Sequence, residues 1–286
     1  MLKPQWRILA IVALVVVLIV VGCTLLLKRP NPGSNSAIAP TIETVHLTMG
    51  NPSNATGNAT KTPNNYLMQK PQYVLSYNNS KHIANWSSWQ LNQSWTGNAP
   101  RSNDFRPDPD LPKSWYAVKS SDYNGSGYDR GHLTPSADRD RDAATNSATF
   151  LMTNIIPQTP DNNRGVWESL ESYSRSLVNA GKELYIIAGG YGASRTIGRE
   201  VKIAVPDRTW KVLVVLDRPG LGLSGVTSDT RVIAVDIPNQ QGIKDADWRK
   251  FRVSVDLIEG RTGYDLLSNI PSSTQEAIES RVDEQS

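Results

Sequence analysis

The segment Asp129-Arg130-Gly131-His132 contains the first residue whose chemistry stands out. Histidine is the side chain best suited to take up a proton near neutral pH, and Gly131 permits a tight backbone that exposes the His132 imidazole. Asp129 and Arg130 are suited to ordering such a loop. The same residues equally describe a charged turn around a histidine with a purely structural role. His132 is therefore a candidate general base that needs support from the rest of the chain.

A second group of polar residues follows between positions 154 and 175. Its members are Asn154-x-x-Pro157-Gln158, then Asn163-x-Gly165-x-Trp167, then Glu171 and Arg175. We predict a helix from about Asn163 to Ala180 that stops at Gly181. At about 100° per residue, Asn163, Glu171 and Arg175 spread over about 120° of this helix, which is close enough to serve one site.

The same helix has simpler interpretations for each polar residue. Glu171 and Arg175 form an i, i+4 pair of the kind that contributes only about 0.2–0.5 kcal/mol on a helix surface. Asn163 at a helix start is also a preferred N-cap. A separate apolar stripe is predicted to face the core. Its members are Val166, Leu170, Tyr173 and Leu177.

The elements that must position these residues are mostly strands. Runs rich in β-branched and aromatic residues, bounded by Gly, Pro or Asp, predict strands at 73–77, 86–91, 184–188, 201–205, 210–216 and 232–237. The first two are expected to pair with each other. Strands outnumber helices and come in clusters, which predicts an α+β fold with a largely antiparallel sheet.

Composition narrows the kinds of site. The chain of 286 residues has one cysteine, Cys23, which excludes an intrachain disulfide and a cysteine-based zinc site. The three histidines, His46, His82 and His132, lie too far apart for metal-ligand spacing. Any catalytic metal must therefore depend on oxygen ligands and water.

The net charge of +3 does not by itself indicate a nucleic-acid partner. Five basic residues and one acidic residue precede position 66, which leaves 25 basic and 26 acidic residues over 66–286, a net charge near −1. Binding of phosphate must therefore rest on local arginines.

The N-terminal part of the sequence predicts attachment to a membrane. Residues 8–27 form an uncharged run flanked by basic residues, long enough to span a bilayer as a helix. Val20-Val21-Gly22-Cys23 also resembles a bacterial lipobox, so a lipid on Cys23 is the alternative to a spanning anchor. Either alternative places the rest of the chain outside the cytoplasm, in the periplasm or at the cell surface.

The chain is thus predicted to have three parts. Residues 1–29 form the anchor or lipoprotein signal. Residues 30–65, rich in Pro, Ser, Asn, Thr and Gly, form a disordered linker. Residues 66–286 form one globular domain.

Taken in order, the motifs resemble the DNA/RNA non-specific endonuclease family, the sugar-non-specific ββα-metal nucleases. The matches are Asp129-Arg130-Gly131-His132, Asn154-x-x-Pro157-Gln158, Asn163-x-Gly165-x-Trp167, Glu171 and Arg175, with Arg101, Phe105 and Asp108 upstream and Ile258-Glu259, Thr262-Gly263 and Leu266-Leu267 downstream. The resemblance covers residues 71–275. It implies the ββα-metal, or His-Me finger, fold, with a central mainly antiparallel sheet flanked by helices.

The resemblance also implies a role for each catalytic residue. His132 would deprotonate the attacking water, Asn163 would be the direct protein ligand of Mg²⁺, and Glu171 would orient water around the metal. One oxygen ligand can suffice because Mg²⁺ gives up its water reluctantly, and Mn²⁺ is expected to substitute. Water as the nucleophile removes any need for a 2′-hydroxyl, so one site would cleave DNA and RNA, leaving 5′-phosphate and 3′-hydroxyl ends.

The matched arginines would hold the substrate. Arg101 and Arg175 would bind the scissile phosphate, with Arg130 adding to the positive field, while Asp129 and Asn154 would support the loop geometry. Contacts to the backbone position a strand without reading its bases, so weak sequence preference is expected. The alternative function is a catalytically silent surface protein that captures nucleic acid, which would need the arginines but not His132, Asn163 or Glu171.

Overall fold

A computed structural model of the chain describes residues 44–285. The predicted apolar span at 8–27, the lipobox at Cys23 and the linker residues 30–43 lie outside the described residues. No helix between residues 44 and 285 is long and apolar enough to cross a membrane.

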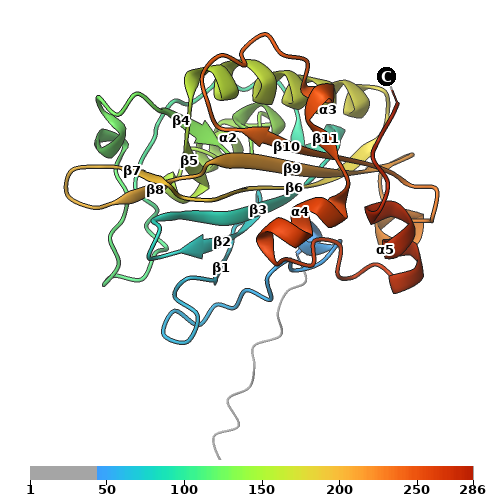
Figure 1. The fold of residues 1–286 in the computed structure, drawn as a ribbon, viewed down its shortest axis with the longest axis horizontal. Coiled ribbons are helices and arrows are strands. Elements are labelled where there is room, and N and C mark those ends of the chain that lie inside the picture. The colour runs from blue at the N-terminus through green and yellow to red at the C-terminus, as the bar shows by residue number, and fades with distance from the viewer. Residues whose placement is uncertain (1–43, 286) are drawn as a thin grey trace, which may run out of the picture. The chain divides into compact units, whose positions relative to one another are not determined.

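Within residues 44–285, the fold is organised around a seven-stranded sheet whose neighbouring strands are all antiparallel (Figure 1). In spatial order its strands are β1 (Tyr66–Gln69), β2 (Val74–Asn78), β3 (Ile83–Leu91), β6 (Glu183–Tyr191), β9 (Arg208–Leu216), β10 (Arg231–Pro238) and β11 (Arg252–Val253). Two ribbons lie outside it: β4 (Asp129–His132) with β5 (Ile155–Gln158), and β7 (Arg195–Ile197) with β8 (Ile203–Val205). The α-helices are α2 (Ala143–Ala148), α3 (Glu168–Asn179), α4 (Val255–Thr262) and α5 (Ser272–Glu279).

The predicted α+β class and mainly antiparallel sheet are confirmed. The runs at 73–77 and 86–91 correspond to β2 and β3, which pair as expected. The runs at 184–188, 210–216 and 232–237 lie inside β6, β9 and β10. The run at 201–205 is different, because only its last three residues form a strand, and that strand belongs to the β7–β8 ribbon.

Both faces of the central sheet are buried. Along β9, Leu213 belongs to the core cluster on one face, while Val212 and Val214 belong to the cluster on the other. The first cluster includes residues of α3 and of the β4–β5 ribbon, and the second includes residues of α4 and α5. Burial on two faces explains why the central strands are apolar runs rather than alternating patterns.

The segment 44–65 is part of the folded domain (the bluest part of the described chain in Figure 1). His46 is buried, with Nδ1 accepting from the Gln90 backbone N–H at 3.2 Å and Nε2 donating to the Pro71 carbonyl at 2.9 Å. Ser53 accepts a 2.8 Å hydrogen bond from the Trp86 indole. The prediction of a disordered linker over 30–65 is therefore wrong for 44–65, because its polar side chains satisfy groups of the sheet.

The predicted helix at 163–180 is present, with an unusual first turn. Asn162–Trp167 form a π-helical turn that leads directly into α3, and Gly181 follows the helix with φ of 88°. A Cβ on Gly165 would lie 2.3 Å from the Lys244 carbonyl oxygen. Only glycine therefore lets that loop cross the helix start at this distance.

The core-facing stripe of α3 is rotated from the predicted one. Leu170 is fully buried as expected, but Ser174 and Val178 are buried in place of Tyr173 and Leu177, which are only partly covered. The small Ser174 donates its hydroxyl to the Leu170 carbonyl at 2.8 Å, so it can face the sheet without an unsatisfied polar group. The rotation brings Glu171 and Arg175 closer to the sheet than the prediction implied.

Candidate active site

A cleft of about 360 Å³ lies where β4, the π-helical turn and α3 meet. It is lined by the six residues expected to touch substrate or metal: Arg101, Arg130, His132, Asn163, Glu171 and Arg175. The other lining residues are Pro135, Ser136, Ala137, Arg164 and Glu168. Two antiparallel strands followed by a helix, as in β4, β5 and α3, form the predicted ββα unit.

His132 ends β4 and is held by aromatic rings. The residue is 8% exposed, and its ring lies 4.8 Å from the Phe150 centroid and 5.5 Å from the Phe105 centroid. Its Nε2 makes no hydrogen bond with any group in residues 44–285. Burial, followed by the positive charge of Arg101, lowers the pKa of His132 to about 3. The imidazole is therefore neutral near pH 7, and one of its two ring nitrogens carries a lone pair.

The backbone around His132 is fixed from behind. Trp167 donates its indole N–H to the His132 carbonyl at 3.3 Å. Asn154 is fully buried, accepts from the Thr134 N–H at 3.0 Å and donates to the Thr134 and Thr149 carbonyls at 2.9 Å. Asn154 thus holds the loop that follows β4 and does not line the cleft.

The side-chain amide of Asn163 is oriented by a carboxylate. Asn163 Nδ2 donates to Asp129 Oδ2 at 2.9 Å, and Asp129 also accepts from Arg164 at 2.7 and 2.5 Å. Although partial burial opposes the effect, the hydrogen bonds from Arg164 and Asn163 lower the pKa of Asp129. The ionised carboxylate therefore fixes which end of the Asn163 amide is the nitrogen.

This orientation fits a hard divalent cation. Asn163 Oδ1 accepts no hydrogen bond from residues 44–285, while its nitrogen is occupied by Asp129. An amide oxygen in a cleft shared with the Glu171 carboxylate is the kind of oxygen donor that Mg²⁺, Mn²⁺ and Ca²⁺ accept. The neutral amide also leaves the charge of such an ion undiminished for a phosphate.

Glu171 belongs to a buried ionic network that crosses from α3 to the sheet. Lys211 Nζ donates to Glu171 Oε1 at 3.4 Å, and Arg175 Nη1 donates to Asp138 Oδ1 at 3.1 Å. Burial raises the pKa of Glu171, and Lys211 opposes that rise. The Lys211 ammonium lies 4.1 Å from the Trp167 ring centroid, which adds a cation–π contact to the network.

Two further arginines approach the cleft from outside α3. The Arg101 guanidinium lies 4.9 Å from the Phe150 ring centroid and hydrogen-bonds Asn103 and Ser136. The Arg130 guanidinium lies 5.1 Å from the Phe105 centroid. With Arg175, and with Arg164 paired to Asp129, four arginines line one cleft, although the domain as a whole is not basic.

The model of the DNA/RNA non-specific endonuclease family matches residues 50–273. This chain belongs to that family. The endonuclease is 55% identical to a nuclease from Nostoc sp. over 270 residues, which cover 93% of this chain and 95% of the relative. It is 30% identical to human mitochondrial endonuclease G over 218 residues, which cover 71% and 70% of the two chains.

A crystal structure of an EndoG/EndoGI complex has the same fold. The superposition has a TM-score of 0.67 at 24% identity and covers 80% of the endonuclease and 92% of that chain. The family and its nuclease members make the endonuclease a hydrolase that cuts DNA and RNA with the help of a divalent metal.

Sequence reasoning missed three charged residues that line the endonuclease cleft or contact its lining residues. Glu168 lines the cleft, Lys211 contacts Glu171, and Asp138 contacts Arg175. Lys211 had a usable signal, because it is the one charged residue inside the apolar run 210–216. Its position between Trp210 and Val212 turns its side chain to the face of the sheet that α3 covers.

Proposed function

We propose that this endonuclease hydrolyses phosphodiester bonds with His132 as the general base and Asn163 as the protein ligand of Mg²⁺. One observation carries the proposal: a buried, neutral imidazole with an unpartnered nitrogen lines the same cleft as an oriented amide oxygen and four arginines. Mn²⁺ is expected to substitute, because its preference for oxygen ligands is similar.

His132 accepts the proton of the attacking water in this proposal. General-base catalysis of this kind contributes about 10²- to 10⁴-fold to the rate. The aromatic rings around His132 fix its ring plane and exclude competing hydrogen bonds. When bound, the metal ion polarises a phosphoryl oxygen and stabilises the leaving 3′-oxygen.

The arginines and Glu171 supply the remaining electrostatics. Arg101, Arg130 and Arg175 neutralise the phosphate and the charge that develops on it during attack. Glu171 accepts hydrogen bonds from water in the cleft, and Lys211 helps to hold its carboxylate in place. Because none of these groups needs a 2′-hydroxyl or a base edge, DNA and RNA are both substrates and sequence preference is weak.

The cleft also argues against the alternative expectation, a catalytically silent protein that captures nucleic acid. It would need the three arginines, but it would have no use for the buried His132 or for the Asp129 contact that orients Asn163. A buried, unpartnered polar atom costs stability, which favours a role for it in catalysis.

The test identifies the chemical groups at the 5′ and 3′ ends of the products. Cleavage of a labelled DNA strand should yield 5′-phosphate ends, which a phosphatase removes, and 3′-hydroxyl ends, which a polymerase extends. Asn163→Ala should keep its melting temperature and lose metal-dependent turnover. Products with 3′-phosphate ends, or undiminished turnover in Asn163→Ala, would contradict the proposed roles.

We also propose that residues 8–27 or a lipid on Cys23 attach the protein to a membrane, with the nuclease domain outside the cytoplasm. The support is the sequence alone: an uncharged run of bilayer length and a lipobox-like segment. Cell fractionation of Cys23→Ala separates the two forms of attachment. Loss of membrane association in this variant favours the lipid, and retention favours the helix. Wild-type protein found wholly in the soluble fraction would contradict both.

A further inference from the structure

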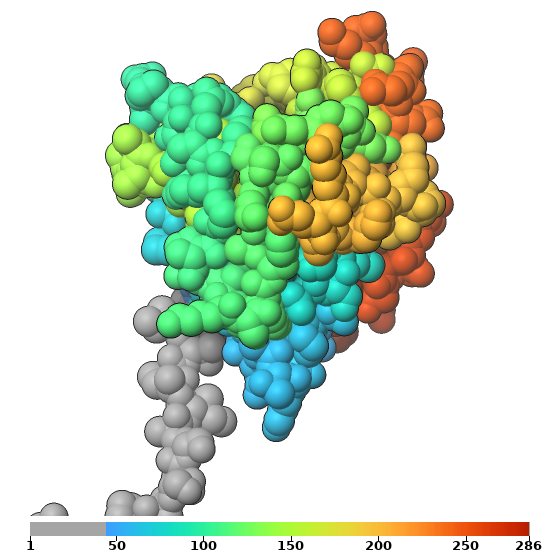
Figure 2. Space-filling model, turned by 90° about the vertical axis from the view of Figure 1, so that its left-hand side faces the viewer, coloured from blue at the N-terminus to red at the C-terminus, as the bar shows by residue number. Residues whose placement is uncertain are grey.

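A second and larger cleft lies beside the active site. It has a volume of about 620 Å³ and lies between residues 121–126 and the β7–β8 ribbon. In Figure 2, the amber atoms of the ribbon lie against the green segment that precedes β4. Most of the residues that line it are polar, and Ile197 is the only large apolar residue among them.

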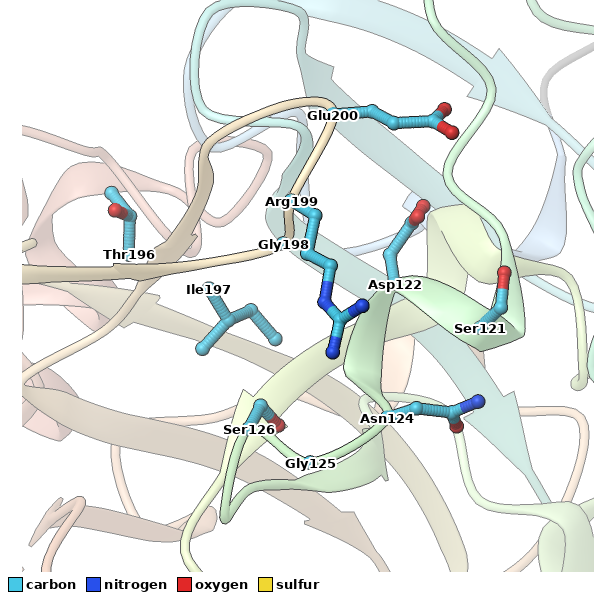
Figure 3. A pocket seen from close by; sticks show the side chains of 10 residues that line it. All are labelled: Ser121, Asp122, Asn124, Gly125, Ser126, Thr196, Ile197, Gly198, Arg199 and Glu200. Carbon is cyan, nitrogen blue, oxygen red and sulfur yellow. The ribbon is translucent and has the colours of Figure 1, made fainter.

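Arg199 is the unpaired charge of this cleft. Figure 3 shows its side chain reaching from the ribbon toward Asn124 and Ser126. Within residues 44–285, Arg199 makes no ion pair and no hydrogen bond through its side chain. An exposed guanidinium with five free donors is well suited to a phosphate.

The two carboxylates of the cleft are already engaged. Glu200 pairs with Lys119 at 3.2 Å, and this contact lowers the pKa of Glu200. Asp122 accepts from the Lys119 backbone N–H at 2.8 Å and from the Tyr116 hydroxyl at 3.2 Å. These contacts leave the Arg199 guanidinium available to a ligand.

A second unpaired cation stands on the same ribbon. Arg195 is exposed and lies 5.9 Å from the centroid of the Tyr128 ring. The lining itself holds one cation, Arg199, and two carboxylates, of which Glu200 is neutralised by Lys119 from outside the lining. Arg195, next to Thr196 of the lining, adds a second unpaired cation. Arginine beside an aromatic ring is a combination that binds single nucleic-acid strands.

The two clefts share a wall. Arg130 lines the active site, and its Nη1 donates to the carbonyl and hydroxyl of Ser120 at 3.1 and 2.7 Å. The next residue, Ser121, lines the second cleft. Tyr128 precedes Arg130 by two residues, or about 7 Å of extended chain. A DNA or RNA strand bound at Arg130 therefore lies next to the second cleft.

We propose that the second cleft binds nucleotides of the same DNA or RNA strand, on one side of the bond that is cut. Arg199 and Arg195 contact its phosphates, and Asn124 and the hydroxyls of the cleft contact sugars or bases. The proposal rests on the function proposed for Arg130. The polar lining argues against a protein partner, because protein interfaces generally have an apolar centre.

The test compares Arg199→Ala and Arg195→Ala with a matched control in the full-length protein. Arg218→Ala removes another exposed arginine, in the loop after β9, at the end of the strand remote from the ribbon. Each variant is assayed with a single strand of about twenty nucleotides and with a trinucleotide too short to occupy both clefts. Binding of the longer strand is then measured at several salt concentrations.

For Arg199→Ala and Arg195→Ala, we expect a several-fold higher KM for the long strand with kcat unchanged. We expect both variants to have unaltered kinetics with the trinucleotide. The slope of log affinity against log salt should fall by about 0.7 for each lost phosphate contact. Arg218→Ala should match the wild type. An unchanged long-strand KM, equal losses with both substrates, or an equal effect of Arg218→Ala would overturn the proposal. Failure of the wild type to cleave either substrate would instead overturn the proposed function.

Discussion

At the scale of single residues, one side chain fixes the orientation of another. Asp129 accepts from the Asn163 amide at 2.9 Å and from Nε and Nη2 of the Arg164 guanidinium. Without Asp129, the Asn163 side chain could rotate and present its nitrogen to the cleft. A metal ligand that is oriented in advance binds more tightly than one that must be ordered on binding.

Asp129→Asn tests this arrangement. The substitution removes the ionised acceptor, so the Mg²⁺ concentration for half-maximal DNA cleavage should rise about tenfold or more. Titration of activity with Mg²⁺ measures the shift, and the melting temperature checks the fold. Arg164→Ala is the matched control, because Asp129 then still accepts from Asn163, and it should shift the requirement far less. Equal shifts in the two variants would contradict the role of Asp129.

The sequence predicted the residues of the cleft better than the contacts among them. Motif order identified His132, Asn163 and Glu171, and the helical period explained how Glu171 and Arg175 share one face with Asn163. The contact between Lys211 and Glu171 joins residues 40 positions apart. No local pattern encodes such a pairing, because it depends on how α3 lies against the sheet.

At the scale of elements, α3 and the turn before it set the geometry of the cleft. The existence and end of this helix follow from its sequence, since a long amphipathic run stops at Gly181. The π-helical turn and the rotated core face do not follow, because they depend on close contacts with β9 and with the loop at Lys244. The order of the polar segment 44–65 does not follow from its sequence for a similar reason, since its partners lie in the distant strand β3.

Gly165→Ala tests the close contact at the helix start. The added Cβ would meet the Lys244 carbonyl at 2.3 Å, so backbone must move. Such overpacking generally costs about 1–3 kcal/mol. We expect a lower melting temperature and slower DNA cleavage, because Asn163 lies in the same turn. Gly260→Ala in α4, where a Cβ meets nothing within 4 Å, is the control and should be neutral or stabilising. Equal changes in melting temperature and cleavage rate in the two variants would show that the close contact at Gly165 does not matter.

His46 makes the stability of the N-terminal segment dependent on pH. Burial, followed by the charge of Arg139, lowers the pKa of His46 to about 4, whereas the unfolded chain titrates near 6.5. Stability is therefore complete above about pH 6.5 and falls as the pH drops toward 4, by about 3 kcal/mol in total. Urea unfolding at pH 7 and pH 5 measures the effect. His46→Gln should lose this part of the pH dependence. Identical pH dependence in variant and wild type would show that His46 does not titrate as expected.

At the scale of the whole molecule, residues 44–285 bury both faces of one sheet. The second face is covered by α4, α5 and the segment that holds Met49 and Ala55, both of them buried. The nuclease site lies on the first face, so its geometry depends on a sheet that is stabilised from both sides. A boundary at residue 66 would divide this unit.

Two truncations test the extent of the folded unit. Removal of residues 1–43 should leave the melting temperature and DNA cleavage unchanged. Removal of residues 1–65 should expose apolar surface around Trp86 and cost roughly 3 kcal/mol or more. Thermal unfolding and a cleavage assay compare the two proteins. Equal stability of both truncated proteins would mean that 44–65 contributes nothing to the domain.

The central claim is that one buried histidine and one metal ion carry the cleavage. The most direct measurement is the rate at which supercoiled plasmid is cut by the wild type and by His132→Ala, each with Mg²⁺ and with EDTA. The account predicts rapid cutting only by the wild type with Mg²⁺, and a loss of at least about a hundredfold in His132→Ala at an unchanged melting temperature. Undiminished cutting by His132→Ala, or by the wild type in EDTA, would contradict it.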